Sequence, residues 1–223
     1  MATTAIENYL KQILLLEEET TDGSLISMGL LAETMKVVPG TATAMVKRLA
    51  DTGLLIYEPY GGVRLSKPGR TQALSILRRH RLIETFLVQA LGLDWSEVHQ
   101  EAEDLEHALS DLVLDRIDAF LHYPTADPHG DPIPAIDGSV SGVGRKSILD
   151  CSPGDRVRIS RILDQNQDFL QFIDRCGLKP GAEVLVQSVD PAADTFLLSV
   201  PGCDTPTTMG RIAARKLMVE PTV

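Results

Sequence analysis

Residues 39–66 read PGTATAMVKRLADTGLLIYEPYGGVRLS and contain two structural patterns in succession. The first half predicts a helix, because Pro39 stands near its start and Gly53 just past its end, the usual positions of these residues. The second half predicts a β-hairpin, because two runs rich in β-branched and aromatic residues flank the turn sequence Tyr-Gly-Gly. A short helix capped by Ser27 and running to Met35 precedes them. The segment is therefore expected to form a helix-turn-helix followed by a hairpin wing.

Charge is distributed unevenly along the chain. Residues 36–81 hold nine basic and two acidic residues, whereas residues 82–150 hold three basic and fourteen acidic ones, within a total net charge of −10. A basic block favours a polyanionic partner, and an acidic block favours cations. Tri-helical units also serve as protein contacts, but the basic block together with the hairpin favours DNA binding.

The predicted recognition helix has a core side and an exposed side. Met45, Val46 and Leu49 are expected to lie in the core. Threonine hydroxyls can bond phosphates or base edges, an alanine methyl can contact thymine, and basic side chains neutralise phosphates. The candidate DNA-contacting residues of this helix and the wing are Pro39, Thr41, Thr43, Ala44, Lys47, Arg48 and Arg64.

Two helices further along the chain carry potential metal ligands. The long helix expected from Ser66 to Gly92 has His80 and Glu84 four residues apart, so these side chains share a face. Residues 98–111, VHQEAEDLEHALSD, are read as a helix that places four such residues on one face: His99, Glu103, Glu106 and His107.

These ligands suit a first-row divalent ion, because imidazole and carboxylate groups bind such ions and no sulfur is present. A solvated charged face is the alternative explanation for any one of them. Glu101 and Asp104 already provide such a face on the same helix, however, so we expect metal binding.

An enzyme is the alternative function. A metal ion held by histidine and glutamate can activate water. The sequence has no His-Glu-x-x-His pattern, no nucleophile elbow and no phosphate-binding loop, and an enzyme would not explain the basic winged unit. A metal-dependent hydrolase or a metal buffer is therefore kept as the second choice, and no catalytic residue is assigned.

The C-terminal third changes character. Residues 124–146, rich in Pro, Gly and Asp, predict a linker and loop. Beyond Leu149, β-type runs interrupted by one helix at residues 164–177 predict a five-stranded barrel. The expected fold is mainly α with a β C-terminal domain. Its parts are a winged helix-turn-helix at 1–73, a helical metal-binding and dimerisation domain at 74–140, a linker at 141–148 and the barrel at 149–223.

Other features bear on the cellular compartment. The three cysteines, Cys151, Cys176 and Cys203, are far apart, which favours reduced thiols over disulfides or a zinc knuckle. No run approaches the roughly 20 apolar residues of a membrane-spanning helix, and the first ten residues lack the features of a signal peptide. We expect a cytoplasmic protein.

The chain resembles the diphtheria-toxin-repressor family of iron- and manganese-dependent transcriptional regulators. The resemblance rests on IENYLKQILLLEEE (6–19), HRLIETFL (80–87), the 98–111 stretch and DPHGDPIP (127–134). It implies an SH3-like barrel of the FeoA type at the C-terminus and a homodimer that binds palindromic double-stranded operator DNA. It also implies repression of metal-uptake genes with the metal as corepressor, and no nucleotide cofactor or membrane contact.

The resemblance also implies two metal sites. The primary site draws on Asn8 with Glu103, Glu106 and His107, and the second on His80, Glu84 and His99. Similar regulators add a ligand from the barrel helix, near Gln165 and Asp168 here. The 127–134 loop offers Asp127 and His129, for which a polar turn is an equally good interpretation.

The choice of metal depends on three positions. Iron-sensing relatives tend to have Cys where this chain has Glu103, whereas manganese-sensing relatives have a carboxylate. Mn(II), which prefers oxygen ligands, is therefore expected, with Fe(II) as the alternative. Asn8 offers a neutral carbonyl oxygen, and Lys11 stands where manganese sensors often have Glu, which argues against a two-metal cluster.

Overall fold

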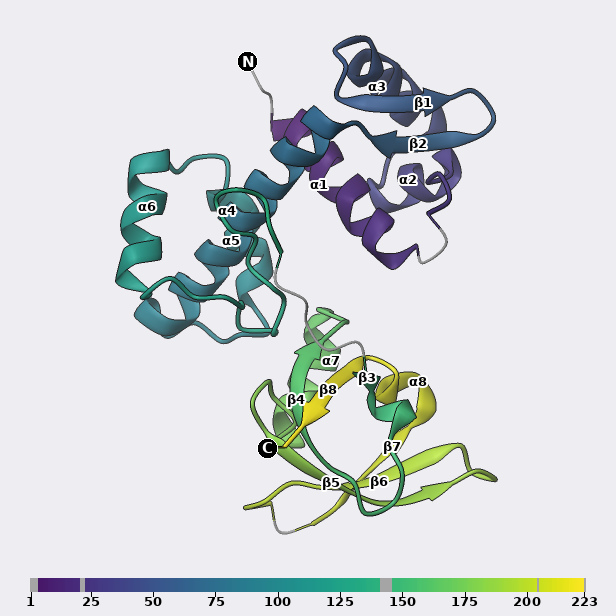
Figure 1. The fold of residues 1–223 in the computed structure, drawn as a ribbon, viewed down its shortest axis with the longest axis vertical. Coiled ribbons are helices and arrows are strands. Elements are labelled where there is room, and N and C mark those ends of the chain that lie inside the picture. Colours follow the sequence, from purple (N-terminus) through teal and green to yellow (C-terminus); the bar gives the residue numbers. More distant parts are fainter. Residues whose placement is uncertain (1–3, 21–22, 141–145, 204, 223) are drawn as a thin grey trace. The chain divides into compact units, whose positions relative to one another are not determined.

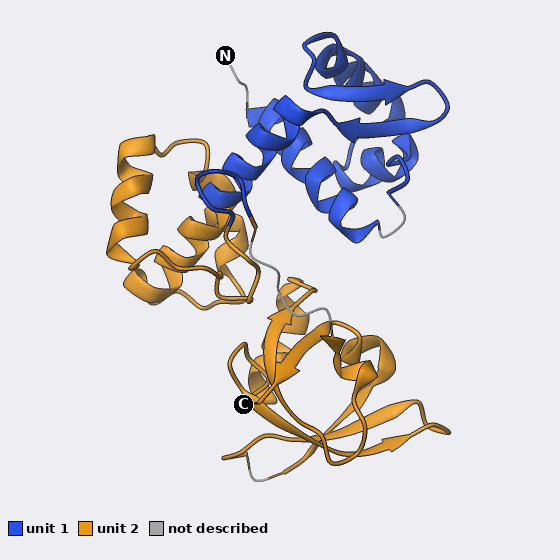
Figure 2. Ribbon diagram, in the orientation of Figure 1, with its two compact units in different colours: residues 1–79, 134–139 blue, residues 80–133, 140–223 orange. Residues whose placement is uncertain are grey.

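The computed structural model describes residues 4–20, 23–140, 146–203 and 205–222 (Figure 1). The chain forms two compact units, which Figure 2 shows in different colours. The first unit comprises residues 1–79 and 134–139, and the second comprises residues 80–133 and 140–223. Among the described residues, no helix combines the length and the apolar character needed to cross a membrane.

The first unit contains the helix-turn-helix and the wing. Ser27 accepts a hydrogen bond from the backbone N–H of Leu30, and Pro39 lies in the first turn of its helix, as the sequence predicts. Backbone hydrogen bonds of 2.9 Å in both directions join Ile26 to Val63 and fix the wing. The elements are α1 (Thr4–Glu19), α2 (Met28–Thr34), α3 (Pro39–Asp51) and the antiparallel strands β1 (Leu55–Glu58) and β2 (Gly62–Leu65).

The core of this unit lies between α1, α3 and the hairpin. Leu10 and Ile13 of α1 and Val46 and Leu49 of α3 are fully buried, while Met45 is half-buried against them. Each fully buried aliphatic side chain contributes roughly 1.5–3 kcal/mol to folding. Truncation of Leu49 to Ala is therefore expected to cost about 2–5 kcal/mol and to loosen the recognition helix.

The long helix α4 (Lys67–Leu91) ends as the sequence predicts. Gly92 follows it with φ +71°, a left-handed conformation that glycine adopts without steric cost. At its start, the hydroxyl of Ser66 accepts a hydrogen bond from the backbone N–H of Gly69 over 3.1 Å.

The next helix, α5 (Val98–Leu105), begins where the sequence predicts but is shorter than predicted. Its N-cap is Glu97, without a side-chain cap, and the preceding Asp94 and Ser96 bond to each other. The helix stops at Leu105, so the next two residues lie in its C-cap and the following turn. The prediction considered only which side chains share a helical face. It did not consider where the backbone hydrogen bonds of the helix end. In the last helix of this part, α6 (Asp111–Phe120), Ser110 is the N-cap and its side chain accepts a hydrogen bond from the backbone N–H of Val113.

The loop that follows α6 is buried rather than solvated. Asp127, His129 and Asp131 are each at most 6% exposed. Burial is possible because the Asp127 carboxylate accepts hydrogen bonds from the backbone N–H groups of His129 and Asp131, over 2.8 and 2.9 Å. Of the predicted linker at 141–148, residues 141–145 fall outside the described part of the chain.

The C-terminal β domain, residues 146–222, is built on one six-stranded antiparallel sheet in the order β3-β8-β4-β5-β6-β7. Figure 1 shows its strands curving around a common centre. The sheet has six strands where the sequence predicts five, and one of them, at 207–210 (TTMG), lacks an apolar alternation and buries only Met209. The elements are β3 (Lys146–Ser147), β4 (Arg156–Ile162), α7 (Gln167–Arg175), β5 (Glu183–Asp190), β6 (Thr195–Ser199), β7 (Thr207–Gly210), α8 (Arg211–Ala214) and β8 (Leu217–Pro221).

Candidate functional site

His80 of α4 lies at the centre of the first group of candidate ligands. Its Nδ1 atom lies 2.8 Å from Oε2 of Glu106, and its Nε2 atom lies 3.0 Å from Oε1 of Glu84. The Nδ1 atom of His99, on α5, lies 3.2 Å from Nε2 of His80. The helices α4 and α5 and the C-cap of α5 therefore bring together residues that the sequence separates by up to 26 positions.

Glu103 and His107 flank this centre. Oε1 of Glu103 lies 3.7 Å from Nε2 of His99 and 3.9 Å from Nδ1 of His80. Nε2 of His107 lies 3.2 Å from Oε1 of Glu106. One ligand atom from each of His80, His99 and Glu103 falls within 4.8 Å of the others, so one ion could bind all three. We call these three residues the His80 cluster.

The second group, which we call the loop cluster, consists of Glu84, Asp127 and His129. One ligand atom from each also falls within 4.8 Å of the others, and all three residues are buried. Oε2 of Glu84, Oδ2 of Asp127 and Nδ1 of His129 have no hydrogen-bond partner. Leaving buried polar atoms unpaired costs about 1–3 kcal/mol each, so this arrangement points to a cation that binds all three.

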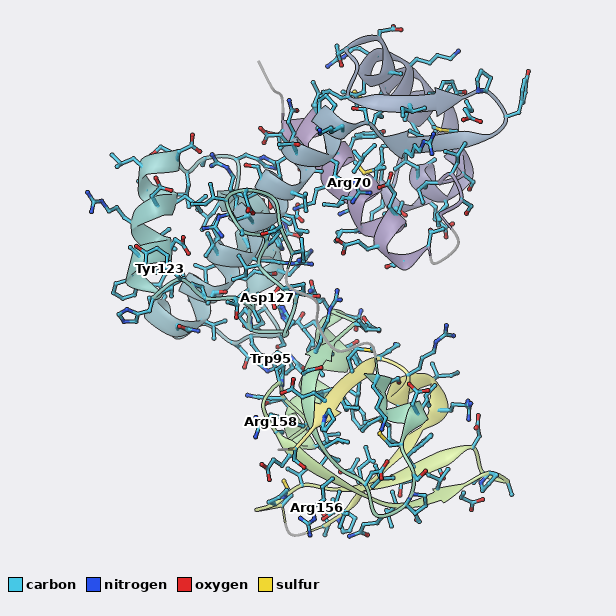
Figure 3. All side chains as sticks on the ribbon, in the orientation of Figure 1. Arg70, Trp95, Tyr123, Asp127, Arg156 and Arg158 are labelled. Carbon is cyan, nitrogen blue, oxygen red and sulfur yellow. The ribbon has the colours of Figure 1, made fainter. Side chains whose placement is uncertain are left out.

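The hydrogen bond of the His129 ring suits such an ion. Its Nε2 atom donates a hydrogen bond to the backbone carbonyl of Trp95 over 2.8 Å, and Figure 3 shows Trp95 and Asp127 in this part of the molecule. In the neutral ring, Nδ1 then carries the lone pair. Metal-binding histidines are oriented by this kind of hydrogen bond.

The carboxylates of the loop cluster are electrostatically unequal. Burial raises the pKa of Asp127 well above its ordinary value, and the neighbouring carboxylates of Asp131 and Glu84 raise it further. The Arg81 guanidinium acts in the opposite direction and lowers this pKa. Burial would also raise the pKa of Glu84, but the charge and hydrogen bonds of His80, with His99, hold that pKa well below its ordinary value. A divalent cation would offset the repulsion between the two carboxylates. The donor set therefore fits a divalent metal ion.

The remaining predicted ligands have other surroundings. Gln165 donates its side-chain amide to Oδ2 of Asp131 over 2.7 Å. Asp168 is exposed in the first turn of α7, where its backbone N–H bonds to Asn166. Asn8 lies half-buried on α1 of the first unit. Their roles as ligands stay predictions.

Sequence reasoning missed the residues that hold the loop. Arg81 donates to the carbonyl oxygen of Pro132 over 2.6 Å and lies 3.7 Å from Oδ1 of Asp131. Asp131 also forms a close ion pair with Arg161 of β4. The sequence feature that could have indicated these contacts is the second aspartate of DPHGDP, Asp131, because a simple polar turn does not require it.

The recognition helix α3 presents the predicted side to solvent. Thr41, Ala44, Lys47 and Arg48 are exposed. Thr43 is half-buried, and its hydroxyl donates a hydrogen bond to the carbonyl of Pro39 over 2.8 Å, so the hydroxyl's lone pairs stay available as acceptors.

The wing adds Arg64, exposed on β2. At its tip Tyr60 is fully exposed with φ +64°, a side chain that the sequence did not single out. No ion pair of Lys47, Arg48 or Arg64 is among the interactions of the described residues. Their charges therefore face solvent, as DNA-contacting cations require.

A winged helix-turn-helix, a helical region with His/carboxylate clusters and a C-terminal β domain together define a class of DNA-binding regulators that respond to metal ions. Three family models match the chain in this order. They are the iron-dependent repressor N-terminal DNA-binding domain (residues 1–63), the iron-dependent repressor metal-binding and dimerisation domain (66–135) and the FeoA domain (146–221).

Similarity to individual proteins extends over most of the chain. The iron-dependent repressor IdeR of Mycobacterium leprae is 32% identical over 213 residues, covering 90% of each chain. The diphtheria toxin repressor of Corynebacterium diphtheriae is 31% identical over 195 residues, covering 82% of this chain and 84% of the other. A solved structure described as a manganese-dependent transcriptional repressor in complex with manganese is 37% identical, with a TM-score of 0.87, and covers 97% of this chain and all of the other.

The chain therefore belongs to the diphtheria toxin repressor family of metal-dependent transcriptional repressors. The predicted family and the predicted fold class, including the SH3-like β domain, are confirmed. Its relatives are regulators rather than enzymes, which removes the hydrolase alternative. A divalent metal, DNA binding and homodimer formation follow from the family.

Proposed function

We propose that the protein is a Mn(II)-dependent repressor in which the metal acts as corepressor. The observation that carries this proposal is the donor set of the two clusters, which consists of imidazole nitrogen and carboxylate oxygen, with Glu103 in the His80 cluster. Mn(II) favours oxygen ligands, whereas a thiolate would shift preference towards softer ions. The similarity to a manganese-dependent repressor bound to manganese supports the same choice.

Fe(II) is the second candidate corepressor. It is favoured by the relatives whose names specify iron, such as the repressor IdeR at 32% identity. Imidazole and carboxylate ligands also accept Fe(II), so the test below includes both ions.

A bound metal ion would neutralise the charge of the carboxylate ligands and would link the segments of the chain that carry them. The residues of the His80 cluster come from α4 and α5, and those of the loop cluster from α4 and the loop after α6. Each ion would therefore hold segments distant in sequence together. If metal favours the DNA-binding form, operator DNA must tighten metal binding by the same factor, because the two equilibria are linked.

We propose that α6 contributes to the dimer surface. Leu112 and Phe120 are 67% and 61% exposed, and Val113 is 42% exposed, although the opposite side of the helix is packed in the core. Apolar side chains gathered on one exposed face mark an interaction surface. The helix also lies inside the segment matched by the metal-binding and dimerisation model.

The proposed DNA target is a palindromic operator of metal-uptake genes. A twofold-symmetric dimer presents two copies of α3, and such pairs read half-sites one helical turn apart, about 34–36 Å. Thr41, Thr43 and Ala44 would face base edges, while Lys47, Arg48 and Arg64 would neutralise phosphates. Pro39 starts the helix and orients its first turn towards the groove. As a regulator of genes, the protein would act in the cytoplasm.

The experiment that tests this function is selection from a labelled library of DNA duplexes at fixed salt. The protein is used metal-free and then loaded with Mn(II), with Fe(II) under anaerobic conditions, or with Zn(II). Selection of one palindrome with Mn(II) at lower metal concentration than with Fe(II) is the expected result. The reverse order would replace manganese by iron, and no selection with any ion would overturn the repressor proposal.

A further inference from the structure

The loop that supplies two ligands to the loop cluster, residues 127–132, also contacts the β domain within the second unit. The backbone N–H of Ile162, the last residue of β4, donates to the carbonyl oxygen of His129 over 2.9 Å. Gly130 packs directly on the same strand, since a Cβ atom there would lie 2.0 Å from the carbonyl oxygen of Ser160. Loop and strand therefore meet backbone to backbone, with no room for a side chain at position 130.

Asp131 adds a charged contact at the same place. Its carboxylate is buried, and Oδ1 forms a close ion pair with Nε of Arg161 while Oδ2 accepts the amide of Gln165 over 2.7 Å. Arg161 lies where the pairing of β4 with β8 is interrupted by a bulge, and bulges redirect side chains. Arg81 of α4 approaches Oδ1 from the helical side, at 3.7 Å. One carboxylate is thus held by both the helical part and the β domain.

The position of Asp131 determines the positions of the metal ligands next to it. Its backbone N–H donates to Oδ1 of Asp127, and its carbonyl accepts the N–H of Asp127, each over 2.9 Å. The N–H of His129 donates to the same Oδ1 atom over 2.8 Å. A displacement of Asp131 must therefore move Asp127 and His129, whose unpartnered Oδ2 and Nδ1 atoms lie near Glu84.

We propose that Asp131 is a positioning residue that couples docking of the β domain to metal binding at the loop cluster. Arg161 and Gln165 hold its carboxylate, and its backbone holds the ligands. Because linkage is reciprocal, metal binding strengthens docking by the factor by which docking strengthens metal binding. The inference rests on the proposed loop cluster, and it gives Gln165 a supporting role in place of the ligand role predicted from the sequence.

The first test measures Zn(II) affinity by competition with a chelator. The binding component lost in His129→Ala is assigned to the loop cluster, and the component lost in His99→Ala to the His80 cluster. Asp131→Asn keeps the shape of the side chain but removes its charge. It is expected to weaken the loop-cluster component about 10- to 100-fold, the range typical of residues that support metal ligands, and to leave the other component unchanged.

Two further variants separate the ion pair from a general loss of charge. Arg161→Ala is expected to reproduce the loss, and the double variant with Asp131→Asn should lose little more than either single variant, because both act through one contact. Arg158→Ala is the matched control on the same strand, since its guanidinium makes an exposed ion pair with Glu183 at 3.5 Å (Figure 3). It should leave both Zn(II) components unchanged.

The second test measures docking of the β domain directly. Trp95 is the only tryptophan of the chain, is 6% exposed and packs in the apolar cluster of the β domain, so its fluorescence reports docking. Quenching by acrylamide should increase in metal-free Asp131→Asn and stay unchanged in Arg158→Ala. Zn(II) should reduce quenching in the unmodified protein and have a smaller effect in Asp131→Asn.

The outcomes distinguish the inference from the function on which it rests. If the unmodified protein has no Zn(II) component that His129→Ala removes, the loop cluster is wrong and the coupling falls with it. If that component exists but Asp131→Asn leaves it intact, only the coupling is overturned. Equal losses of both Zn(II) components, together with a lowered melting temperature, would also overturn the coupling and assign Asp131 a purely structural role.

Discussion

His80 and Glu106 are 26 residues apart in sequence, yet Nδ1 of His80 lies 2.8 Å from Oε2 of Glu106. The other ring nitrogen faces Glu84 at 3.0 Å and His99 at 3.2 Å. One imidazole therefore touches residues that the sequence assigned to two separate metal sites. His80 belongs to the His80 cluster and also contacts Glu84 of the loop cluster, so a change at His80 should affect both clusters.

Substitution of His80 by Ala should remove metal-dependent DNA binding. The change deletes a proposed ligand. It also removes the imidazole that contacts the buried carboxylates of both Glu84 and Glu106. Metal affinity, measured by calorimetry, should fall by more than the ~10- to 100-fold typical of supporting residues. His122→Ala is the control, because this exposed histidine lies outside both clusters. Retained metal affinity in His80→Ala would contradict the His80 cluster.

Substitution of Glu103 by Cys should change the preferred metal. A thiolate in the His80 cluster is a softer ligand than a carboxylate, so preference should move from Mn(II) towards Fe(II) or Zn(II). A shift of about tenfold in the ratio of dissociation constants, equivalent to about 1.4 kcal/mol, is expected in competitive binding. Glu101→Cys, an exposed position on the same helix, should not alter the ratio. An unchanged ratio in Glu103→Cys would place selectivity elsewhere.

The sequence predicted those parts of the fold that depend on local rules. Ser27 caps a helix as expected, and Gly92 ends α4, because caps and left-handed glycines act within a few residues. The end of α5 at Leu105 was not predicted. It depends on the turn that carries Glu106 back towards α4, which a helical period does not reveal.

The residues of the predicted second site lie close together, since the His80 ring is 3.0 Å from Glu84 and 3.2 Å from His99. The sequence did not reveal that Glu103 also approaches His80 and His99, or that Glu84 also approaches Asp127 and His129. The second of these groups depends on the loop after α6, which hydrogen bonds hold to β4 and α4. Such tertiary bonds leave no periodic signal in a segment rich in Pro and Gly, which the sequence predicts to be a linker and loop.

Substitution of Lys47 by Ala should weaken DNA binding equally for all sequences. Lys47 is exposed on α3 and would neutralise a phosphate, so its loss should reduce the salt slope of operator binding by about 1. The measurement is binding of the metal-loaded protein over a range of salt concentrations. Arg175→Ala, an exposed cation on α7, should leave the slope unchanged. The same slope in Lys47→Ala would remove this residue from the set of phosphate contacts.

Substitution of Gly130 by Ala should detach the loop from β4. Gly130 has φ +83° and a Cβ atom would lie 2.0 Å from the carbonyl oxygen of Ser160, so either the loop or the strand must move. Gly138→Ala is a matched control, because its φ is +81° but its Cβ would meet Leu74 at an ordinary 3.5 Å. Both variants suffer the cost of a left-handed alanine, about 1–2 kcal/mol. Only Gly130→Ala should also increase acrylamide quenching of Trp95 and weaken Zn(II) binding at the loop cluster. Equal behaviour of the two variants would mean that backbone strain alone, and not the contact with β4, governs the loop.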